Sequence, residues 1–477
     1  MSRAEARCAW RGRRVAGALR CLRPLAMVLA ICVMSAQAGI ARAASQEWVA
    51  TWAQAMTSSF TCARSTDAHA LTATCDIASE HDPILRKATL RQVVRASLGG
   101  NVVRIRLSNY FGRMPLTVSA AHVALASGPA GGFTIAPASD RGLTFSGRDS
   151  VTIAPGAVVT SDAVRLRVPS LARMVISLYF AGAAPLADVH AMEHASTAAA
   201  VAGDAVGADS LRGRTDVIGT LGKDARHHVY VLDEVDVHAS PGTRAIVAFG
   251  DSITDGAYAS APDKTWPGVL AQLADANAEP AAVINMGISG NELTVDQPGN
   301  PGYGVSALKR FERDVIERAG VTDVVVLLGI NDVDRGTDAA GFPNGASFGA
   351  IVAGYRMLID IAHAHHLKIY AGTMTPFAGF RAPGWYSPPK EAIRARVNRW
   401  IRTSSAFDGV IDFSHELAGA YKPGPLAARQ VPLPPGLASI CAGDTGLHPN
   451  DRGYAVMGTF AYDTLFSGHL LPRRGCR

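Results

Sequence analysis

Two stretches of the chain differ in the rhythm of their hydrophobic and polar positions. From about Glu47 to His238, short segments of alternating apolar and polar residues are separated by turns rich in Gly, Pro, Ser and Asp. A period of two places one face of a strand in a core, and short strands at this spacing are typical of an antiparallel β-sandwich. We therefore expect a β-sandwich-like region, with strands at Val102–Leu107, Val164–Val168 and Met174–Phe180.

From Thr243 onward, short apolar runs alternate with helical patterns. This order predicts a three-layer α/β domain, in which helices cover both faces of a parallel sheet and ligands bind beyond the carboxyl ends of the strands. The expected strands are Ala245–Phe249, Ala281–Asn285, Asp323–Leu328, Lys368–Thr373 and Gly409–Phe413. The expected helices are Trp266–Ala276, Ser306–Ala319, Ser347–His365, Lys390–Ser404 and Asn450–Phe466.

The N-terminus has the pattern of an export signal. Arginines between Arg11 and Arg23 precede the apolar run Leu25–Val33, and Ala41-Arg42-Ala43 fits the small-x-small cleavage rule. The run is shorter than the roughly 20 residues that span a bilayer, so we expect no stable membrane insertion. We expect residues 1–43 to be a cleaved signal peptide, 44–240 a β-rich accessory domain and 241–477 the catalytic domain of a secreted or periplasmic protein.

Composition and charge add little to this picture. The 477 residues are 48% hydrophobic and 18% charged, which is typical of a globular protein of about two domains. The formal charge is +6, but arginines near the N-terminus carry much of it. The charge therefore does not indicate nucleic-acid binding, and no nucleic-acid partner is expected.

Four cysteines follow the expected cleavage site: Cys62, Cys75, Cys441 and Cys476. An even number in an exported chain suggests two disulfides, and four cysteines allow three connectivities. Proximity in the chain favours pairing the first two and the last two. The alternative is four buried thiols.

Residues suited to acyl transfer follow the buried strands. Ser252 comes after the first strand, in Gly250-Asp251-Ser252-Ile253, where a helix is expected to start. Gly290 follows the second strand, Asn331 the third, and His448 precedes the final helix. A serine nucleophile needs a histidine base, and the tetrahedral intermediate needs hydrogen-bond donors at its oxyanion.

These motifs resemble those of the SGNH hydrolases, also called the GDSL esterase/lipase family. The resemblance covers about residues 243–470 and implies an SGNH/flavodoxin-like fold. It also implies Ser252 as nucleophile, His448 as base, and an oxyanion hole built from the Ser252 N–H, the Gly290 N–H and the Asn331 side chain. No metal or other cofactor is implied.

The chain departs from the family at the carboxylate that orients the histidine. The family places an Asp three residues before the His, where this chain has Thr445, and Asp444 lies one position further back. We expect Asp444 to orient His448 through a slightly longer loop. Asp412, at the end of a strand, or a backbone carbonyl are the alternatives.

A second motif is interpreted as a chance match. His190-Ala191-Met192-Glu193-His194 fits H-x-x-E-H, a zinc-protease pattern. That chemistry needs a helix presenting both histidines on one face, whereas this segment lies among expected strands.

We therefore expect a serine esterase that acts on a small-molecule or polysaccharide ester, removing short acyl groups such as acetyl. A lipase or lysophospholipase, acyl transfer to a sugar, and a non-catalytic polysaccharide-binding protein are the alternatives. The β-rich region is expected either to bind carbohydrate or to shape one wall of the site. Activity is expected to rise as His448 loses its proton, near neutral pH for an unshifted pKa.

Overall fold

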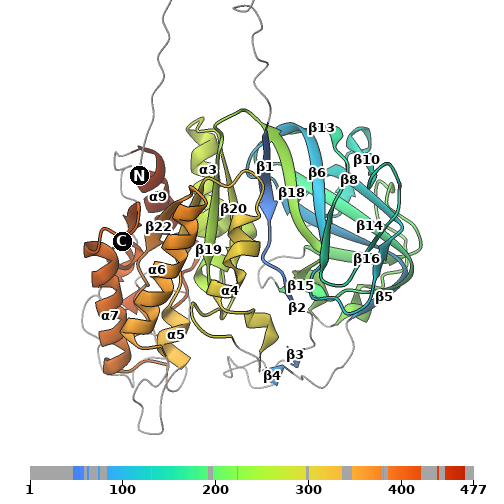
Figure 1. The fold of residues 1–477 in the computed structure, drawn as a ribbon. Coiled ribbons are helices and arrows are strands. Elements are labelled where there is room, and N and C mark those ends of the chain that lie inside the picture. Colours follow the sequence, from blue (N-terminus) through green and yellow to red (C-terminus); the bar gives the residue numbers. More distant parts are fainter. Residues whose placement is uncertain are drawn as a thin grey trace, which may run out of the picture. The chain divides into compact units, whose positions relative to one another are not determined.

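A five-stranded parallel sheet forms the centre of the chain from residue 241 onward, here called the α/β part (Figure 1). The strand order is β20-β19-β21-β22-β23. Gly250 at the end of β19 is in register with Gly287 on one neighbour and with Leu327 on the other. Three strand ends therefore lie at one edge of the sheet. The bounds are β19 Arg244–Gly250, β20 Ala281–Gly287, β21 Asp323–Leu327, β22 Lys368–Gly372 and β23 Gly409–Ile411.

The structure is a computed structural model. It describes residues 47–58, 62–63, 74–75, 83–129, 132–191, 197–222, 224–296, 300–335, 346–378, 380, 385–419, 438–439 and 446–467. The expected signal peptide, Asp444, Cys441 and Cys476 lie outside these residues.

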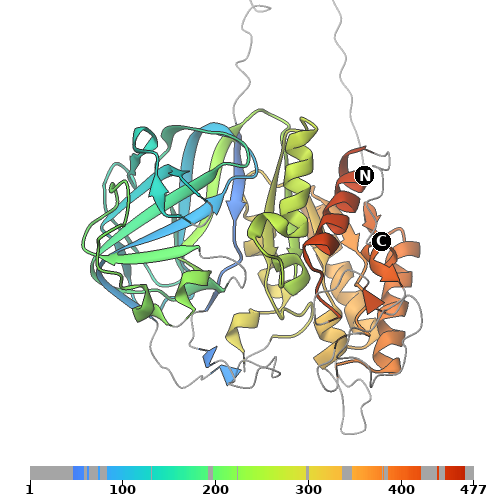
Figure 2. The same ribbon diagram turned by 180° about the vertical axis from the view of Figure 1, so that it is seen from behind.

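Helices cover both faces of the parallel sheet. Helices α3 and α9 pack together on one face, and α4, α6 and α7 lie over the other (Figures 1 and 2). Side-chain caps start the longer ones: the Thr265 hydroxyl accepts an N–H of α3, and the Ser347 hydroxyl accepts one of α6. The bounds are α3 Trp266–Ala276, α4 Ala307–Phe311, α6 Phe348–Ala364, α7 Pro388–Thr403 and α9 Asp451–Tyr462.

Antiparallel sheets make up most of the described residues before residue 241, here called the β-rich part. One sheet has the order β1-β18-β6-β12, with β13 also paired to β6, and another has the order β10-β8-β14-β5-β16, with β9 paired to β8. A third, smaller sheet has the order β17-β15-β2. The first sheet consists of β1 Glu47–Ala53, β18 Leu232–Ala239, β6 Gly100–Asn109, β12 Ala157–Thr160 and β13 Val164–Val168. The second consists of β10 Arg141–Leu143, β8 Ala120–Ser127, β14 Arg173–Pro185, β5 Ile84–Arg95, β16 Ala198–Ala202 and β9 Thr134–Ile135. The third consists of β17 His228–Tyr230, β15 Asp188–Ala191 and β2 Thr57–Ser58.

Each part has its own hydrophobic core, and strand β1 joins the two. It pairs with β18 in the β-rich part, yet Ala50 and Ala53 are buried in the core of the α/β part. Buried Arg318 also forms ion pairs across the parts, at 3.1 Å to Asp233 and 2.9 Å to Glu234. Both parts belong to one compact unit.

The predicted elements are largely found where the sequence pattern placed them. Helix α3 and strand β13 have the predicted bounds, and the other predicted strands and helices shift by a few residues at their ends. Two expectations were wrong. Phe413 begins the short helix α8 (Phe413–Leu417) and does not end β23, and the helix expected to reach Ala319 turns from α4 into a π-helical segment, Glu312–Ile316.

Two further observations concern the exported-protein expectations. Among the described residues, the helices are all too short or too polar to cross a membrane. Cys62 and Cys75 are paired residues of the two short antiparallel strands β3 (Cys62–Ala63) and β4 (Thr74–Cys75).

Candidate active site

Ser252 lies in the turn between β19 and the short helix α2 (Ser252–Asp255), of which it is the first residue. Asp251 caps this helix by accepting the second helical N–H at 3.0 Å, so the cap is the aspartate and not the serine. A Cβ atom on Gly250 would lie 2.0 Å from Oγ1 of Thr254, so a glycine is required where the strand meets the helix. The hydroxyl is thus held at the carboxyl edge of the sheet, where ligands bind in such folds.

His448 contacts the serine directly. Its Nε2 atom lies 2.8 Å from Oγ of Ser252. His448 precedes α9, and the Tyr454 hydroxyl of α9 donates to the carbonyl of Ala257, just after the nucleophile's helix, at 2.8 Å. This buried bond joins the segment that carries His448 to the turn that carries Ser252. It therefore helps to position the two side chains relative to each other.

The expected oxyanion donors come from three neighbouring strand ends. The Ser252 N–H is the first of its helix and has no intrahelical partner. Gly290 has a φ of 78°, and a Cβ there would lie 2.3 Å from the ring of Tyr303, so both backbone conformation and space require glycine. Asn331 follows β21, and its amide donates to the carbonyl of Asn291 at 2.9 Å, which fixes the amide and leaves its second hydrogen as a donor.

A buried arginine holds the loops of the site together. Arg310 donates to the carbonyls of Gly250 at 2.8 Å and Met286 at 2.9 Å, and to the side-chain oxygen of Asn291 at 2.9 Å. Asp314 balances its charge at 3.0 Å. One guanidinium therefore links the end of the nucleophile strand to the loop that carries Gly290. The sequence pattern does not reveal this role, because the partners of Arg310 lie at strand ends that are distant in the sequence.

Two buried carboxyl groups complete the framework. Burial, with a contribution from the charge of Asp332, raises the pKa of Asp251 to about 7, although its hydrogen bond to the helix opposes the shift. Burial also raises the pKa of Asp332, although it accepts the N–H groups of Leu293 at 2.7 Å and Thr294 at 2.9 Å. These bonds fix the segment that follows Gly290.

Asp412, one alternative for orienting His448, is engaged elsewhere. It accepts two hydrogen bonds from Arg402, both at 2.7 Å, and one from the Thr373 hydroxyl at 2.8 Å. Burial alone would raise the pKa of Asp412, but these bonds hold it below its usual value. Asp412 is thus engaged with Arg402 and Thr373, whereas Asp444, the expected orienting residue, lies outside the described residues.

Aromatic rings surround the base. Tyr258, whose φ of 67° is unusual for a residue other than glycine, stacks its ring 5.4 Å from that of His448 at 26°. Phe380 meets the same ring edge-on at 6.1 Å. Burial among such groups lowers the pKa of His448 to about 4. The expectation that activity rises near neutral pH assumed the ordinary pKa of histidine, which is higher.

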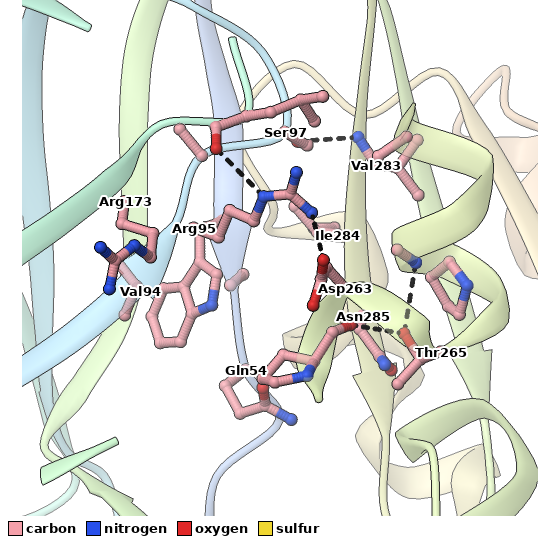
Figure 3. A pocket seen from close by; sticks show the side chains of 18 of the residues that line it. Gln54, Val94, Arg95, Ser97, Arg173, Asp263, Thr265, Val283, Ile284 and Asn285 are labelled. Carbon is pink, nitrogen blue, oxygen red and sulfur yellow. Dashed lines mark hydrogen bonds and ion pairs between the residues drawn. The ribbon is translucent and has the colours of Figure 1, made fainter. Parts of the chain in front are cut away.

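A cavity of about 460 Å³ lies between the β-rich part and the α/β part (Figure 3). Its walls are mostly apolar, and Arg95 and Asp263 form an ion pair across it at 3.5 Å. Its lining includes Asp255, at the end of the nucleophile's helix, but not Ser252. The cavity thus reaches the end of helix α2 but is not lined by Ser252 at the start of that helix.

A hydroxyl in contact with an imidazole can carry out nucleophilic acyl transfer, and the expected oxyanion donors all follow neighbouring strands of the same sheet. Residues 248–456 match the GDSL-like Lipase/Acylhydrolase family. The chain therefore carries a domain of this family, as the resemblance of its motifs predicted.

No curated protein sequence is significantly similar to the chain. Among solved structures, the aryl esterase of M. smegmatis is 18% identical with a TM-score of 0.34, and the match covers 46% of this chain and 97% of that one. A carbohydrate acetylesterase from Sinorhizobium meliloti is 16% identical with a TM-score of 0.34, over 46% of this chain and 97% of that one.

Proposed function

We propose that this protein is a secreted serine esterase that removes short acyl groups from a carbohydrate or another small ester. The observation that carries the proposal is the 2.8 Å contact between Ser252 Oγ and His448 Nε2. This distance lies within the range in which a base removes a hydroxyl proton. The buried, close-packed setting of the pair argues against a decayed site that only binds polysaccharide.

Catalysis proceeds through an acyl-enzyme. Ser252 Oγ attacks the ester carbonyl carbon as its proton passes to His448 Nε2, and the oxyanion receives hydrogen bonds from the Ser252 and Gly290 N–H groups and the Asn331 amide. The bond to the alcohol then breaks, and His448 returns the proton to the departing oxygen. Water then attacks the acyl carbon while His448 takes one of its protons. The bond from that carbon to Ser252 Oγ breaks, and His448 returns the proton to Oγ, which releases the acid and restores the serine hydroxyl. Asp444 accepts a hydrogen bond from the Nδ1–H of His448 throughout.

The substrate class is argued from the surroundings of the base. Tyr258 is 44% exposed and Phe380 lies on another side of His448, so aromatic surfaces border the place where the alcohol departs. Such surfaces pack well against a sugar ring or a small acyl group. The β-rich part contacts the α/β part through buried ion pairs, which favours a role in shaping the site.

The remaining expectations form part of the same proposal. Residues 1–43 are a signal peptide, 44–240 a β-sandwich-like accessory domain and 241–477 a three-layer catalytic domain. We also propose a Cys62–Cys75 disulfide, because paired residues of antiparallel strands are close enough for one. Cys441 and Cys476 would form the second.

The test is hydrolysis of p-nitrophenyl esters of increasing chain length by wild type and Ser252→Ala, with EDTA present. Turnover of acetate and butyrate by wild type alone supports the proposal. Preference for long chains would favour a lipase or lysophospholipase, and faster product formation with added sugar would favour acyl transfer. Inertness of both proteins on every ester would favour the binding protein.

A further inference from the structure

His190, the first histidine of the H-x-x-E-H segment, lies in the β-rich part but reaches the catalytic turn. We propose that His190 is a positioning residue for Ser252, holding the nucleophile's helix in place through Asp255. The inference rests on the proposed esterase function and assigns a catalytic purpose to the β-rich part.

The position of the His190 ring is fixed by strand β15 and by the segment after β1. The side chain is 2% exposed, and Nδ1 lies 2.8 Å from the carbonyl of Ala55. A carbonyl only accepts hydrogen bonds, so Nδ1 carries a proton. Nε2 lies 3.1 Å from Oδ1 of Asp255, and this contact is an ion pair when the ring is protonated. Gln54 contacts the same nitrogen at 2.7 Å.

Asp255 connects His190 to both sides of the reaction centre. It is the last residue of the four-residue helix that begins with Ser252, and its N–H donates to the Asp251 carbonyl at 2.8 Å. Its second oxygen, Oδ2, accepts the hydroxyl of Ser289 at 2.7 Å. Ser289 immediately precedes Gly290, so one carboxylate joins the nucleophile's turn to the oxyanion loop.

Packing alone does not hold this carboxylate. Asp255 and Gln54 both line the 460 Å³ cavity between the two parts. One side of each of these two side chains therefore faces the cavity and not close-packed atoms. Figure 3 shows Gln54 and Asn285 at the walls of this cavity. Directional contacts are therefore needed to fix Asp255, and His190, when its Nε2 also carries a proton, supplies a hydrogen bond from the β-rich part.

A small displacement of the helix would be costly for catalysis. Only two residues separate Ser252 from Asp255 in a single helical turn. A misplacement of reacting groups by about 1 Å can slow a reaction about 100-fold without removing any reacting group. Loss of the His190–Asp255 contact is thus expected to lower kcat much more than it changes KM.

Two amide substitutions separate the two ring nitrogens. In His190→Gln the amide nitrogen reaches the place of Nε2 and retains the contact with Asp255. In His190→Asn it occupies the place of Nδ1 and retains only the contact with Ala55. Asp255→Asn removes the charge from the other side of the pair. His122→Asn is the matched control, because His122 pairs with Asp140 at 2.9 Å wholly within the β-rich part.

The measurements are kcat and KM on p-nitrophenyl acetate, the rate of Ser252 phosphonylation by a fluorophosphonate, and Tm. We expect His190→Asn and Asp255→Asn to lose about 10- to 100-fold in kcat and in labelling rate, with KM within about threefold. We expect His190→Gln to retain most of both rates, and His122→Asn to match wild type. Reaction temperatures are kept well below the Tm of every variant.

Equal rates for His190→Asn and His190→Gln, or rates that follow Tm across all four variants, would overturn the positioning role while leaving the esterase proposal intact. If wild type fails to hydrolyse esters but labels at Ser252, the labelling rates alone decide the positioning role. If wild type neither hydrolyses nor labels, both proposals fail.

Discussion

Ser252 Oγ and His448 Nε2 lie 2.8 Å apart although 196 positions separate the two residues in the chain. The serine begins the short helix after β19, the first strand of the parallel sheet along the chain, and the histidine precedes the last described α-helix. The contact is formed because α9 packs on α3 and is bound to the loop after Ala257 by the Tyr454 hydroxyl. The fold thus brings a hydroxyl and an imidazole together from opposite ends of the α/β part.

Removing the Asn331 amide should impair the chemical step. Asn331→Ala is expected to lower kcat about 10²- to 10³-fold with little change in KM, because an oxyanion donor acts mainly in the transition state. Steady-state kinetics on p-nitrophenyl acetate measure this. Asn109→Ala is the matched control, a buried amide in the β-rich part that donates to two backbone carbonyls. It should lower Tm and leave kcat within about twofold, and equal losses in the two variants would argue against an oxyanion role.

The orienting carboxylate should control the acid limb of the pH profile. Burial lowers the pKa of His448 to about 4, and an ionised Asp444 at Nδ1 would raise it by stabilising the imidazolium. Activity needs the neutral ring, so it is lost as pH falls through this pKa. Asp444→Asn is therefore expected to move the acid limb of kcat/KM to lower pH, and to reduce kcat by up to about 10⁴-fold.

Asp412→Asn serves as the comparison for that experiment. It breaks an ion pair with Arg402 and should reduce Tm, while kcat and the acid limb stay close to those of wild type. A shifted acid limb in Asp412→Asn, with none in Asp444→Asn, would reverse the assignment of the orienting residue.

Burial of Asp251 should make folding stability depend on pH. Because its pKa is raised to about 7, the folded carboxyl keeps a proton that the unfolded chain loses near pH 4. The contribution of the Asp251 carboxyl to folding stability is therefore fully present below about pH 4 and is lost as pH rises towards 7. Asp251→Asn retains a capping side chain. Its free energy of unfolding, relative to that of wild type, should therefore increase by about 1–3 kcal/mol when the pH is raised from 5 to 8. Urea unfolding of both proteins at pH 5 and at pH 8 measures this. A difference in unfolding free energy that is the same at the two pH values would contradict a raised pKa of Asp251.

The sequence predicted the parallel strands and the loops of the site because both leave short-range patterns. The run Val324–Leu328 is apolar throughout, as expected of a strand buried on both faces, and Ser252 and Asn331 follow two or three residues after such runs. The burial of Arg310, by contrast, results from contacts with strand ends distant in sequence. His190 could not be connected with Asp255 in advance, because the two lie 65 positions apart in different parts of the fold.

The central claim is that Ser252 is the nucleophile, and covalent trapping tests it most directly. Wild type and Ser252→Ala are incubated with a fluorophosphonate, and the labelled peptide is identified by mass spectrometry alongside hydrolysis of p-nitrophenyl acetate. The account predicts one adduct on the peptide containing Ser252, with parallel loss of activity, and neither adduct nor activity in the variant. An adduct on another residue, or a variant that hydrolyses the ester at the rate of wild type, would contradict it.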